Sequence, residues 1–568
     1  MLALLMLVGC TSQQPGETED ASRLILDSSY VLIFSDDTGR EAAAAFNEIY
    51  AAATGVTLKM GRDTETEKAD REIVFGKTNR AGAYKVDDTT LVSNAFVLAC
   101  AEKRVFIAAT SPEGYDAAID EFFKQTLGFE NVDSVVKTDK QPALPANFEL
   151  RTEPSGEYEP GKMASGISYR VEGAEKELLN YYIFTESVTY SFDPAISGSF
   201  NAYTLTYSTG AYLKGEMTCH SGSESWTEEF FLEPGQKMQF TSLLNVALKG
   251  GKADSVTSVK FTILKGDRAN LLVEDLSLTA RELPDDDVIY ISDGKYKLGV
   301  TLLWGGGVSY LEDLADGDHN ITNLLNDHDT GRLIQQSFYG TNRTPYQPAY
   351  FGETLWCYNP VQGGDQYGNH SKLVDFRIAE DGKSIYVKCQ PLDWAQKNML
   401  TPSYMENTYM IEDGYVKVAN RFIDFSGYIH RNAHQELPAF YTISYLSDFV
   451  YYEGTNGWAN EELTVKKNLP FWAGNQDAYF NLSSKETWCA WVTPEGYGVG
   501  VYTPVAKILL AGRYGDNNSK DSSNDHTNYV SPLITYKLKT LDAFQYSYYI
   551  TTGSVEEIRS TFKEIGQK

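Results

Sequence analysis

Apolar and polar residues alternate in short runs through most of this chain after residue 167. Between residues 167 and 283 the runs include ISYRVEG, YTLTYS and KMQFTSLL. Between residues 288 and 568 they are longer, as in NTYMIEDGYVKVANRFIDF. A period of two residues is typical of strands that bury one face, so both regions are predicted to be antiparallel β-structure. The first region predicts a two-sheet β-sandwich, and the second predicts a larger unit of the same kind.

A different pattern occurs between residues 24 and 150, where strands alternate with helices. SSYVLIFSD and REIVFGKTNR predict strands, and AFVLACAEKRVFIAAT predicts a β-hairpin. GREAAAAFNEIYAAATG predicts a helix that Gly55 closes, and SPEGYDAAIDEFFKQTLG predicts a helix with Ser111 as its N-cap and Pro112 at its first position. This alternation predicts a small α/β sandwich. A last helix is predicted at SVEEIRSTFKEIG, with Ser554 as its cap.

Two turn-rich, polar segments separate these regions. They are RTEPSGEYEPGKMASG at residues 151–166 and RELPDDD at residues 281–287. The predicted fold class is therefore a multidomain, mainly β chain. Its predicted parts are a signal and tether (1–23), a small α/β sandwich (24–150), a β-sandwich (167–283) and a large antiparallel β-unit (288–568).

The N-terminal segment resembles a bacterial lipoprotein signal. Leu7-Val8-Gly9-Cys10 matches a lipobox, which predicts cleavage after Gly9 and acylation of Cys10. The polar segment that follows, Thr11–Asp20, is typical of a flexible tether. We therefore expect a location at the bacterial cell envelope, on the extracytoplasmic side, with membrane contact through the lipid anchor only.

Charge and cysteine content exclude several classes of function. The formal net charge is −28, from 77 acidic and 49 basic residues, so a nucleic-acid partner is not expected. The five cysteines after Cys10 are widely spaced, which predicts buried thiols and neither a disulfide framework nor a CxxC metal site. The chain also has 38 Tyr and 27 Phe, which is common in β-sheet proteins with sugar-contacting surfaces.

The segment from Asn326 to Gly368 contains the mixture of side chains that proteins use to hold a sugar. Amides and arginine hydrogen-bond ring hydroxyls, aromatic rings cover apolar sugar faces, and carboxylates transfer protons. The candidate acids are Asp329 and Asp365. The candidate contacts to substrate are Arg332, Gln335, Gln336, Tyr339, Trp356, Asn359 and Gln362. If LIQQSFY is a strand, Gln335 and Ser337 face one way and Gln336 and Phe338 the other, so one glutamine is expected in a pocket and one in the packing.

A second cluster, HRNAHQELPAFYT, adds Glu436 and His434. Glu436 lies beside a predicted turn at Leu437-Pro438 and is a candidate general acid or base. The alternative is a structural ion pair between Glu436 and Arg431 or Arg421. Trp458 is a candidate cleft wall, and Trp226 is either a sugar platform or a residue packed at the sandwich edge.

Metal and cofactor chemistry have no motif in this sequence. His328, His319, His370, His430 and His434 show no diagnostic ligand spacing on a helix, so no metal is predicted. WGGGVSYLEDL lacks the lysine of a phosphate loop and predicts a bulge or tight crossover. No serine nucleophile elbow, HExxH, Walker A or dinucleotide-binding glycine motif occurs in a matching context, and no cofactor is expected.

Three regions resemble parts of known carbohydrate-active proteins. The order of elements up to residue 150, with the phrase EIVFGKTNR, resembles the accessory N-terminal domain of glycoside hydrolases such as hexosaminidases and α-glucuronidases. The strand LLVEDLSL resembles the end of jelly-roll carbohydrate-binding modules, and the last region resembles the galactose-mutarotase-like supersandwich. These resemblances imply two accessory domains before a catalytic one.

The sequence thus predicts a surface-anchored glycoside hydrolase that cleaves a glycan or polysaccharide. Its catalytic carboxylates would come from Asp329, Asp365 and Glu436, because glycosidic cleavage generally uses two carboxyl groups. Two alternatives stay open. One is a glycan-binding lipoprotein without activity, and the other is a polysaccharide lyase in which Tyr and His transfer the proton.

Overall fold

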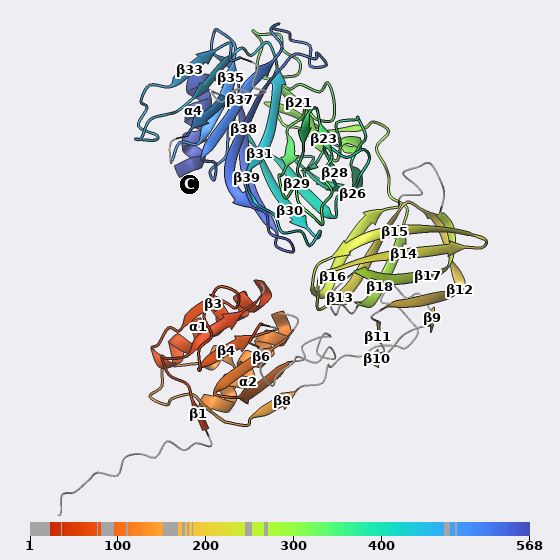
Figure 1. Cartoon of the computed structure of the whole chain (residues 1–568), viewed down its shortest axis with the longest axis vertical. Coiled ribbons are helices and arrows are strands. Elements are labelled where there is room, and N and C mark those ends of the chain that lie inside the picture. The colour runs from red at the N-terminus through yellow and green to blue at the C-terminus, as the bar shows by residue number, and fades with distance from the viewer. Residues whose placement is uncertain are drawn as a thin grey trace, which may run out of the picture.

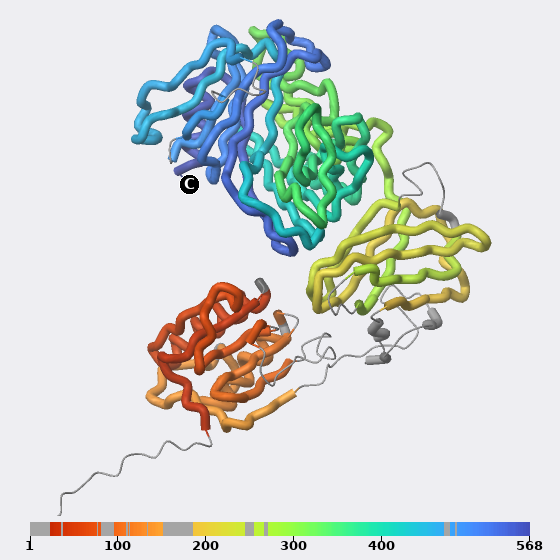
Figure 2. Tube along the Cα trace, viewed as in Figure 1, coloured from red at the N-terminus to blue at the C-terminus, as the bar shows by residue number. Residues whose placement is uncertain are grey.

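A computed structural model describes most of the chain. The described residues are 23–35, 37–76, 78–80, 96–109, 112–151, 169–172, 176–178, 181–184, 186–244, 253–265, 271–470, 478–482 and 485–567. The predicted lipobox with Cys10, the predicted cap Ser111 and the linker residues 152–166 lie outside them. Strands dominate the described part and form three units, the α/β unit, the sandwich unit and the large β unit (Figures 1 and 2). The predicted fold class is confirmed.

The α/β unit has a six-stranded mixed sheet with two helices packed on one face. In order of pairing the strands are β3 (Lys59–Arg62), β2 (Val31–Phe34), β4 (Glu72–Phe75), β6 (Arg104–Ala108), β5 (Val97–Ala101) and β8 (Glu149–Arg151). The helices are α1 (Asp37–Thr54) and α2 (Pro112–Leu127), and β1 (Arg23–Ile25) pairs with β7 (Ala143–Pro145). Phe46 of α1 contacts Phe122 of α2 at 4.8 Å between ring centroids, so both helices share one core. Gly55 follows α1 at φ +78°, as the predicted closing glycine requires.

The sandwich unit consists of two five-stranded antiparallel sheets. One sheet contains β10 (Lys176–Leu178), β11 (Tyr181–Phe184), β18 (Leu271–Thr279), β13 (Ala202–Thr209) and β16 (Gly235–Leu243). The other contains β15 (Glu224–Leu232), β14 (Leu213–Ser221), β17 (Ala253–Lys265), β12 (Ser187–Phe200) and β9 (Tyr169–Glu172). Trp226 lies on the edge strand β15 and packs against the core between the sheets, which agrees with the packing alternative for this residue.

The sandwich unit and the large β unit share buried contacts. Phe231 of β15 stacks on Phe425 with 5.2 Å between ring centroids, and its backbone N–H donates to the Tyr404 hydroxyl at 3.0 Å. Arg421 forms an ion pair with Glu233 across the same boundary. The core of the sandwich therefore continues into the large β unit.

The large β unit contains a three-stranded, a seven-stranded and a nine-stranded antiparallel sheet. The first has β19 (Val288–Ser292), β20 (Tyr296–Thr301) and β21 (Gly307–Asp313). The second has β28 (Leu392–Asp393), β25 (Pro360–Val361), β22 (Gln335–Ser337), β31 (Asn432–Ile443), β38 (Thr527–Lys537), β37 (Ile508–Tyr514) and β34 (Tyr479–Asn481). The third has β26 (Lys372–Ile378), β27 (Ser384–Gln390), β29 (Ser403–Glu412), β30 (Tyr415–Asp424), β39 (Phe544–Ser554), β36 (Tyr497–Tyr502), β35 (Trp488–Val492), β32 (Asp448–Tyr451) and β33 (Thr464–Lys467). A small hairpin of β23 (Tyr350–Phe351) and β24 (Thr354–Leu355) stands apart from them.

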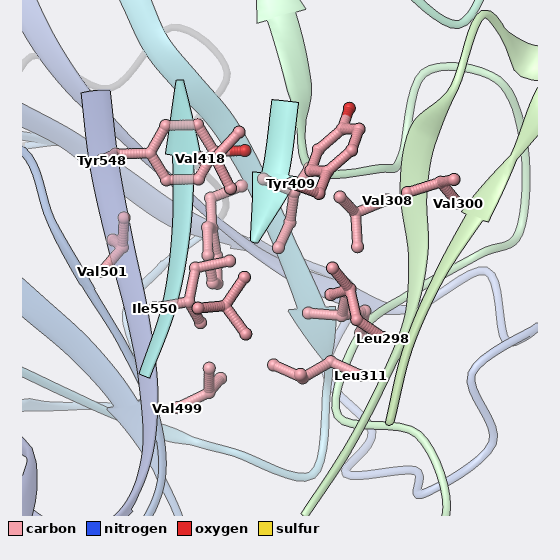
Figure 3. Close-up of a cluster of buried hydrophobic side chains, with 14 of the residues drawn as sticks. Leu298, Val300, Val308, Leu311, Tyr409, Val418, Val499, Val501, Tyr548 and Ile550 are labelled. Carbon is pink, nitrogen blue, oxygen red and sulfur yellow. The ribbon is translucent and has the colours of Figure 1, made fainter. Parts of the chain in front are cut away.

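One apolar core joins these three sheets. Figure 3 shows Leu298 of β20 and Leu311 of β21 facing Val418, Val499 and Ile550 of the nine-stranded sheet. The seven-stranded sheet covers another part of the same core. There Phe338 stacks on Phe422 with 4.4 Å between ring centroids. Only one face of the seven-stranded sheet is used in this packing, so its other face is available for a site.

A β-bulge in β31 changes which residues face the core. The pairing of β31 with β38 shifts register between Glu436 and Phe440. The predicted turn at Leu437-Pro438 is therefore wrong, because these residues continue the strand as its bulge. Glu436 precedes the bulge, Ala439 and Tyr441 follow it, and all three face away from the core. In a strand without a bulge, Glu436 would face the opposite side from Ala439 and Tyr441.

Two local predictions about chain ends and turns are confirmed. The glycine-rich segment WGGGVSYLEDL contains the β-bulge that was one of its two predictions, because the pairing of β20 with β21 shifts register between Gly299 and Val300. The 3-10 turn η3 (Leu302–Trp304) and the glycines after it close this antiparallel hairpin. A Cβ on Gly305 would lie 2.3 Å from the backbone oxygen of Gln362, and Gly305 has φ +59°. The final helix α4 (Val555–Gln567) begins with a capping box, in which Ser554 Oγ accepts from Glu557 N and Glu557 Oε2 accepts from Ser554 N.

The cysteines of the described part are buried free thiols, as predicted. They are Cys100, Cys219, Cys357, Cys389 and Cys489. No helix among the described residues is long and apolar enough to cross a membrane.

We expect Leu298→Ala to lower the free energy of unfolding by about 2–5 kcal/mol, because Leu298 is fully buried between two sheets. Leu303→Ala is the matched control, since Leu303 is 44% exposed, and it should change stability by about 0.5 kcal/mol or less. Chemical denaturation followed by tryptophan fluorescence measures the unfolding of the large β unit, because every tryptophan except Trp226 follows residue 288. Equal losses in both variants would contradict the arrangement of the core.

Candidate functional site

A cavity of about 410 Å³ lies on the outer face of the seven-stranded sheet. Its walls combine aromatic rings with a few polar groups, which is typical of ligand sites. The described residues that line it are Gly331, Gln335, Ser337, Tyr339, Phe351, Trp356, Asn359, Val361, Trp394, Arg431, Asn432, Ala433, His434, Glu436, Ala439, Tyr441, Tyr479, Leu510, Tyr514, Tyr529 and Leu533. We refer to this cavity as the pocket.

Glu436 lies at the floor of the pocket, at the centre of the sheet. It is opposite Ser337 of β22 on one side and opposite Leu533 of β38 on the other. The Tyr529 hydroxyl donates a hydrogen bond to Glu436 Oε1, and the side chains of Ser337 and Tyr339 also hydrogen-bond the carboxyl group. Glu436 is 7% exposed and is the only carboxylic residue among the described lining residues.

Burial changes the protonation of this cluster. Desolvation raises the pKa of Glu436 above its usual value, although hydrogen bonds from Tyr529, Ser337 and Tyr339 act in the opposite direction. Desolvation, followed by the nearby Glu436 charge, also raises the pKa of Tyr529 and of Tyr339 well above the usual tyrosine range. The phenols are therefore proton donors at neutral pH, and burial shifts Glu436 towards its protonated form.

An aromatic wall stands on the side of the pocket formed by the small hairpin. Trp356 contacts Tyr339 edge-on at 6.2 Å and Phe351 edge-on at 5.2 Å between ring centroids. Phe351 in turn contacts Trp394 at 5.8 Å. Trp356 Nε1 donates to Asn359 Oδ1 at 2.9 Å, which holds the indole ring in place. Such a wall offers flat apolar surface beside the polar floor.

The four predicted amides separate into two groups. Gln335 and Asn359 line the pocket, where Gln335 Oε1 accepts from Gly363 N at 2.7 Å. Gln336 and Gln362 are fully buried behind the sheet. Gln336 Nε2 donates to Asn407 Oδ1 at 2.8 Å, and Gln362 Nε2 donates to the Gly305 backbone oxygen at 3.0 Å.

Gln336 and Gln362 therefore join strands instead of contacting a ligand. Successive side chains of β22 alternate between the two faces of the sheet, so Gln336 points into the core while Gln335 points to the pocket. The strand pattern predicted this division of the two adjacent glutamines.

Asp365 lies outside the pocket lining and organises a loop. Its carboxylate accepts hydrogen bonds from the backbone N–H groups of Tyr367 at 2.9 Å, Asn369 at 3.0 Å and Asn398 at 2.6 Å. Asn369 Nδ2 donates a fourth, at 2.8 Å. Asp365 is 1% exposed, so its oxygens are occupied by the loop that they hold. The structure thus places Asp365 among loop-forming hydrogen bonds and not among the residues that line the pocket.

Asp329 and Arg332 lie beside the pocket, next to the lining residue Gly331. Asp329 Oδ1 accepts from Gly331 N at 2.9 Å, and Asp329 Oδ2 is 3.4 Å from Arg332 Nε. Arg332 also donates to the Asp525 backbone oxygen at 2.6 Å and lies over the ring of Tyr514, which lines the pocket. The Asp329 side chain is 45% exposed. Burial is the main cause of the raised pKa of Tyr441, and the charge of Asp329 makes a smaller contribution in the same direction.

His434 lines the pocket and Trp458 does not. His434 Nδ1 is 3.1 Å from the Thr535 hydroxyl, and its ring is 5.8 Å from that of Tyr479. Trp458 packs edge-on against Tyr502 beside helix α4, in a separate apolar cluster. The structure thus does not bring Trp458 together with the pocket residues, and its ring completes the packing of α4.

Several residues that line the pocket were not predicted as site residues from the sequence. They are Ser337, Phe351, Trp394, Arg431, Tyr441, Tyr479, Tyr514 and Tyr529. Tyr529 and Leu533 lie an even number of residues apart in NYVSPLITY, so period-two alternation could have placed them on one face. The position of Tyr441 on the same face as Glu436 depends on the bulge in β31 at Leu437-Pro438, where the sequence was interpreted as a turn.

No group of three or more His, Cys, Asp or Glu residues in the described ranges has the geometry of a metal site. Two of the histidines that were considered as ligands, His319 and His328, contact neighbouring residues. His319 Nδ1 is 2.8 Å from Asp316 Oδ1, and His328 Nδ1 is 2.7 Å from the Ser523 backbone oxygen.

The sequence matches no protein-family model and no curated protein. Among solved structures it is similar to a galactose mutarotase-like protein from Lactobacillus casei, at 13% identity over 47% of this chain and 99% of that chain, with a TM-score of 0.28. A GH36 alpha-galactosidase from Geobacillus stearothermophilus is 13% identical over 49% of this chain and 42% of that chain, with a TM-score of 0.30. A 4-alpha-glucanotransferase from Thermococcus litoralis is 10% identical over 46% and 37%, with a TM-score of 0.24. Values this low assign no activity to this chain.

The pH dependence of stability tests the protonation of Glu436. The folded protein holds this proton more tightly than the unfolded chain does, so folding takes up a proton above the usual Glu pKa of 4.5. The free energy of unfolding should therefore fall by up to about 1.4 kcal/mol per pH unit as pH rises from that value to the raised pKa. Glu436→Gln should remove this contribution and make the protein relatively more stable at neutral pH.

Denaturation curves between pH 4 and pH 8 measure the difference between parent and variant. Glu380→Gln, at an exposed glutamate, is the control and should leave the pH dependence unchanged. The pKa of Asp393, which burial raises to about 6, adds a fall of the same sign to all three proteins and cancels in the comparison. Parallel curves for parent and Glu436→Gln would show that Glu436 has an ordinary pKa.

Proposed function

We propose that the protein binds a carbohydrate in the pocket and acts on it through proton transfer by Glu436. The observation that carries this proposal is the position of Glu436, a buried acid among three hydroxyl donors beneath an aromatic wall. Sugars present both apolar ring faces and hydroxyl groups, which suit Trp356 on one side and Gln335 and Asn359 on the other. The volume of about 410 Å³ falls in the range of small-molecule sites.

The reaction that we infer is glycosidic cleavage. A carboxyl group with a raised pKa is suited to give its proton to the glycosidic oxygen while the bond from that oxygen to the anomeric carbon breaks. Water then adds to the anomeric carbon, and its proton passes to a second, ionised carboxylate. Asp329 is the candidate for this second role, because it lies beside Gly331 at the pocket edge and is partly exposed next to Arg332.

A glycan-binding protein without activity is the second candidate. It is favoured by the fact that Glu436 is the sole carboxylic residue among the described lining residues, whereas cleavage generally needs two carboxyl groups. In that case Glu436, Tyr529 and Tyr339 would only donate and accept hydrogen bonds to sugar hydroxyls. The lyase alternative would use a pocket tyrosine with His434, but phenols with raised pKa values are poor bases at neutral pH.

For cleavage, we expect Glu436→Gln to lower the rate of formation of new reducing ends by about 10²-fold or more, because general acid catalysis is typically worth that factor. Asp329→Asn should lower it to a similar degree. The measurement is a panel of polysaccharides assayed for reducing ends with parent and variants. Asp365→Asn is the contrasting variant, and it should act through thermal stability because its carboxylate holds a loop.

Binding is measured on the same panel to separate the two candidates. Trp356→Ala should weaken binding about tenfold, and Trp356→Phe should retain most of it because a flat ring remains. Binding that depends on Trp356, without product from any polysaccharide, would favour the non-catalytic candidate. Product formation that Glu436→Gln leaves unchanged would contradict the proposed role of Glu436.

We further infer that acylation of Cys10 anchors the protein to the bacterial envelope, as its lipobox implies. Replacing the acylated thiol should release the protein, because no helix among the described residues offers another membrane span. Cell fractionation should therefore find the parent in the membrane fraction and Cys10→Ser outside it. Membrane association that survives in Cys10→Ser would contradict lipid anchoring at this residue.

A further inference from the structure

Arg431 lies between the pocket and a second cavity. It lines the pocket and also a neighbouring cavity of about 430 Å³, which we call the side cavity. The other residues of the side cavity are Thr341, Asn342, Arg343, Thr344, Ile429 and His430. A ligand that fills the pocket and extends past Arg431 would therefore enter the side cavity, where Arg343 is a second cation.

Most arginines of this acidic protein are neutralised by carboxylates. Arg421 pairs with both Glu233 and Glu406, and Arg80 and Arg104 share the buried Glu72. Arginines engaged in this way are not available to a ligand.

Arg431 and Arg343 differ from this pattern. Arg431 Nε donates to the Gly340 backbone oxygen at 3.2 Å, and the guanidinium also contacts the Cys357 thiol. No carboxylate of the described residues forms an ion pair with Arg431 or Arg343, and both side chains are exposed. The bond from Nε fixes one edge of the guanidinium, and the terminal N–H groups that do not contact Cys357 can meet an anionic group.

The charge inside the pocket also favours an anion. Glu436 is the only carboxylic residue among the described lining residues, and burial raises its pKa, which weakens negative charge there. Arg431 is the only lysine or arginine among the same residues. One base and one buried acid thus line the pocket, although acids outnumber bases by 28 in the whole protein.

We propose that the ligand is an acidic glycan, in which a carboxylate or sulfate group is held by Arg431 and the chain continues over Arg343 into the side cavity. This inference rests on the proposed carbohydrate function and adds the substrate class. Arginine suits both groups, because its planar fork donates two parallel hydrogen bonds to paired anionic oxygens.

The overall charge of −28 does not oppose such a contact. Salt screens charges over about 8 Å at physiological ionic strength, so distant acids act weakly on a group in contact with Arg431. The same charge disfavours densely charged polymers such as nucleic acid. The expected ligand therefore carries well-separated anionic groups along a sugar chain.

Matched pairs of polysaccharides test this inference by affinity electrophoresis and calorimetry. Polygalacturonate and alginate are compared with their carboxyl-reduced forms, and dextran sulfate and pullulan sulfate with unsulfated dextran and pullulan. We expect the full-length protein to prefer the acidic member of at least one pair by about tenfold. Preference confined to the first two pairs identifies a carboxylate, and preference confined to the last two identifies a sulfate.

The variants Arg431→Gln and Arg343→Gln should reduce this preference while leaving affinity for the neutral member within about twofold, because they remove only contacts to the anion. Arg431→Lys should restore part of it, since lysine keeps the charge and loses the fork. Arg40→Gln, which removes an exposed arginine from the α/β unit, is the control and should have no effect.

Three outcomes overturn the inference in distinguishable ways. Equal or tighter binding of the neutral members, or an acidic preference that Arg431→Gln leaves intact, refutes the acidic ligand while the proposed carbohydrate site stands. If acidic and neutral polysaccharides bind equally well to the parent and to Trp356→Ala, the pocket is not the binding site. Absence of binding to every polysaccharide refutes the proposed function and this inference together.

Discussion

Phe338, Leu437 and Phe440 attach the seven-stranded sheet to the nine-stranded sheet, and this packing decides which side chains can reach the pocket. Each strand must give one face to the shared core, because a sheet that left both faces in water would bury too little apolar surface. The opposite face then collects Glu436, Tyr529 and their neighbours in one layer. The candidate site is thus a consequence of core packing, and surface loops supply only its walls.

The same arrangement has a cost in stability. A buried carboxylic acid such as Glu436 is unfavourable unless it is neutral or fully hydrogen-bonded, and the structure provides the Tyr529, Tyr339 and Ser337 hydroxyls. Natural proteins keep such groups mainly where chemistry needs them. Asp365 is a useful contrast, since its buried carboxylate is satisfied by backbone N–H groups of its own loop and of Asn398, and it does not line the pocket. Burial of an acid therefore indicates function only together with a pocket.

The sequence predicted the fold more fully than the site, for physical reasons. Period-two alternation identified the two β regions and the opposite directions of Gln335 and Gln336, because both follow from the local geometry of a strand. Long-range contacts have no such local signal. The bulge after Glu436, which brings Tyr441 to the same face, and the pairing of β31 with β38, which brings Tyr529 to Glu436, depend on tertiary packing. Asp365 and Trp458 were predicted in the cleft from residue type alone, and their surroundings give them structural roles.

A crystal structure of the protein with a bound oligosaccharide would show whether the pocket is the carbohydrate site. We expect a sugar in the pocket, with a ring face on Trp356 and a sugar oxygen within about 2.6–3.2 Å of the Glu436 carboxyl group. An ordered sugar elsewhere, for instance on the sandwich unit near Trp226, with the pocket occupied only by water, would show that the pocket is not the carbohydrate site. Such a result would leave the large β unit as a scaffold and move the search for function to another surface.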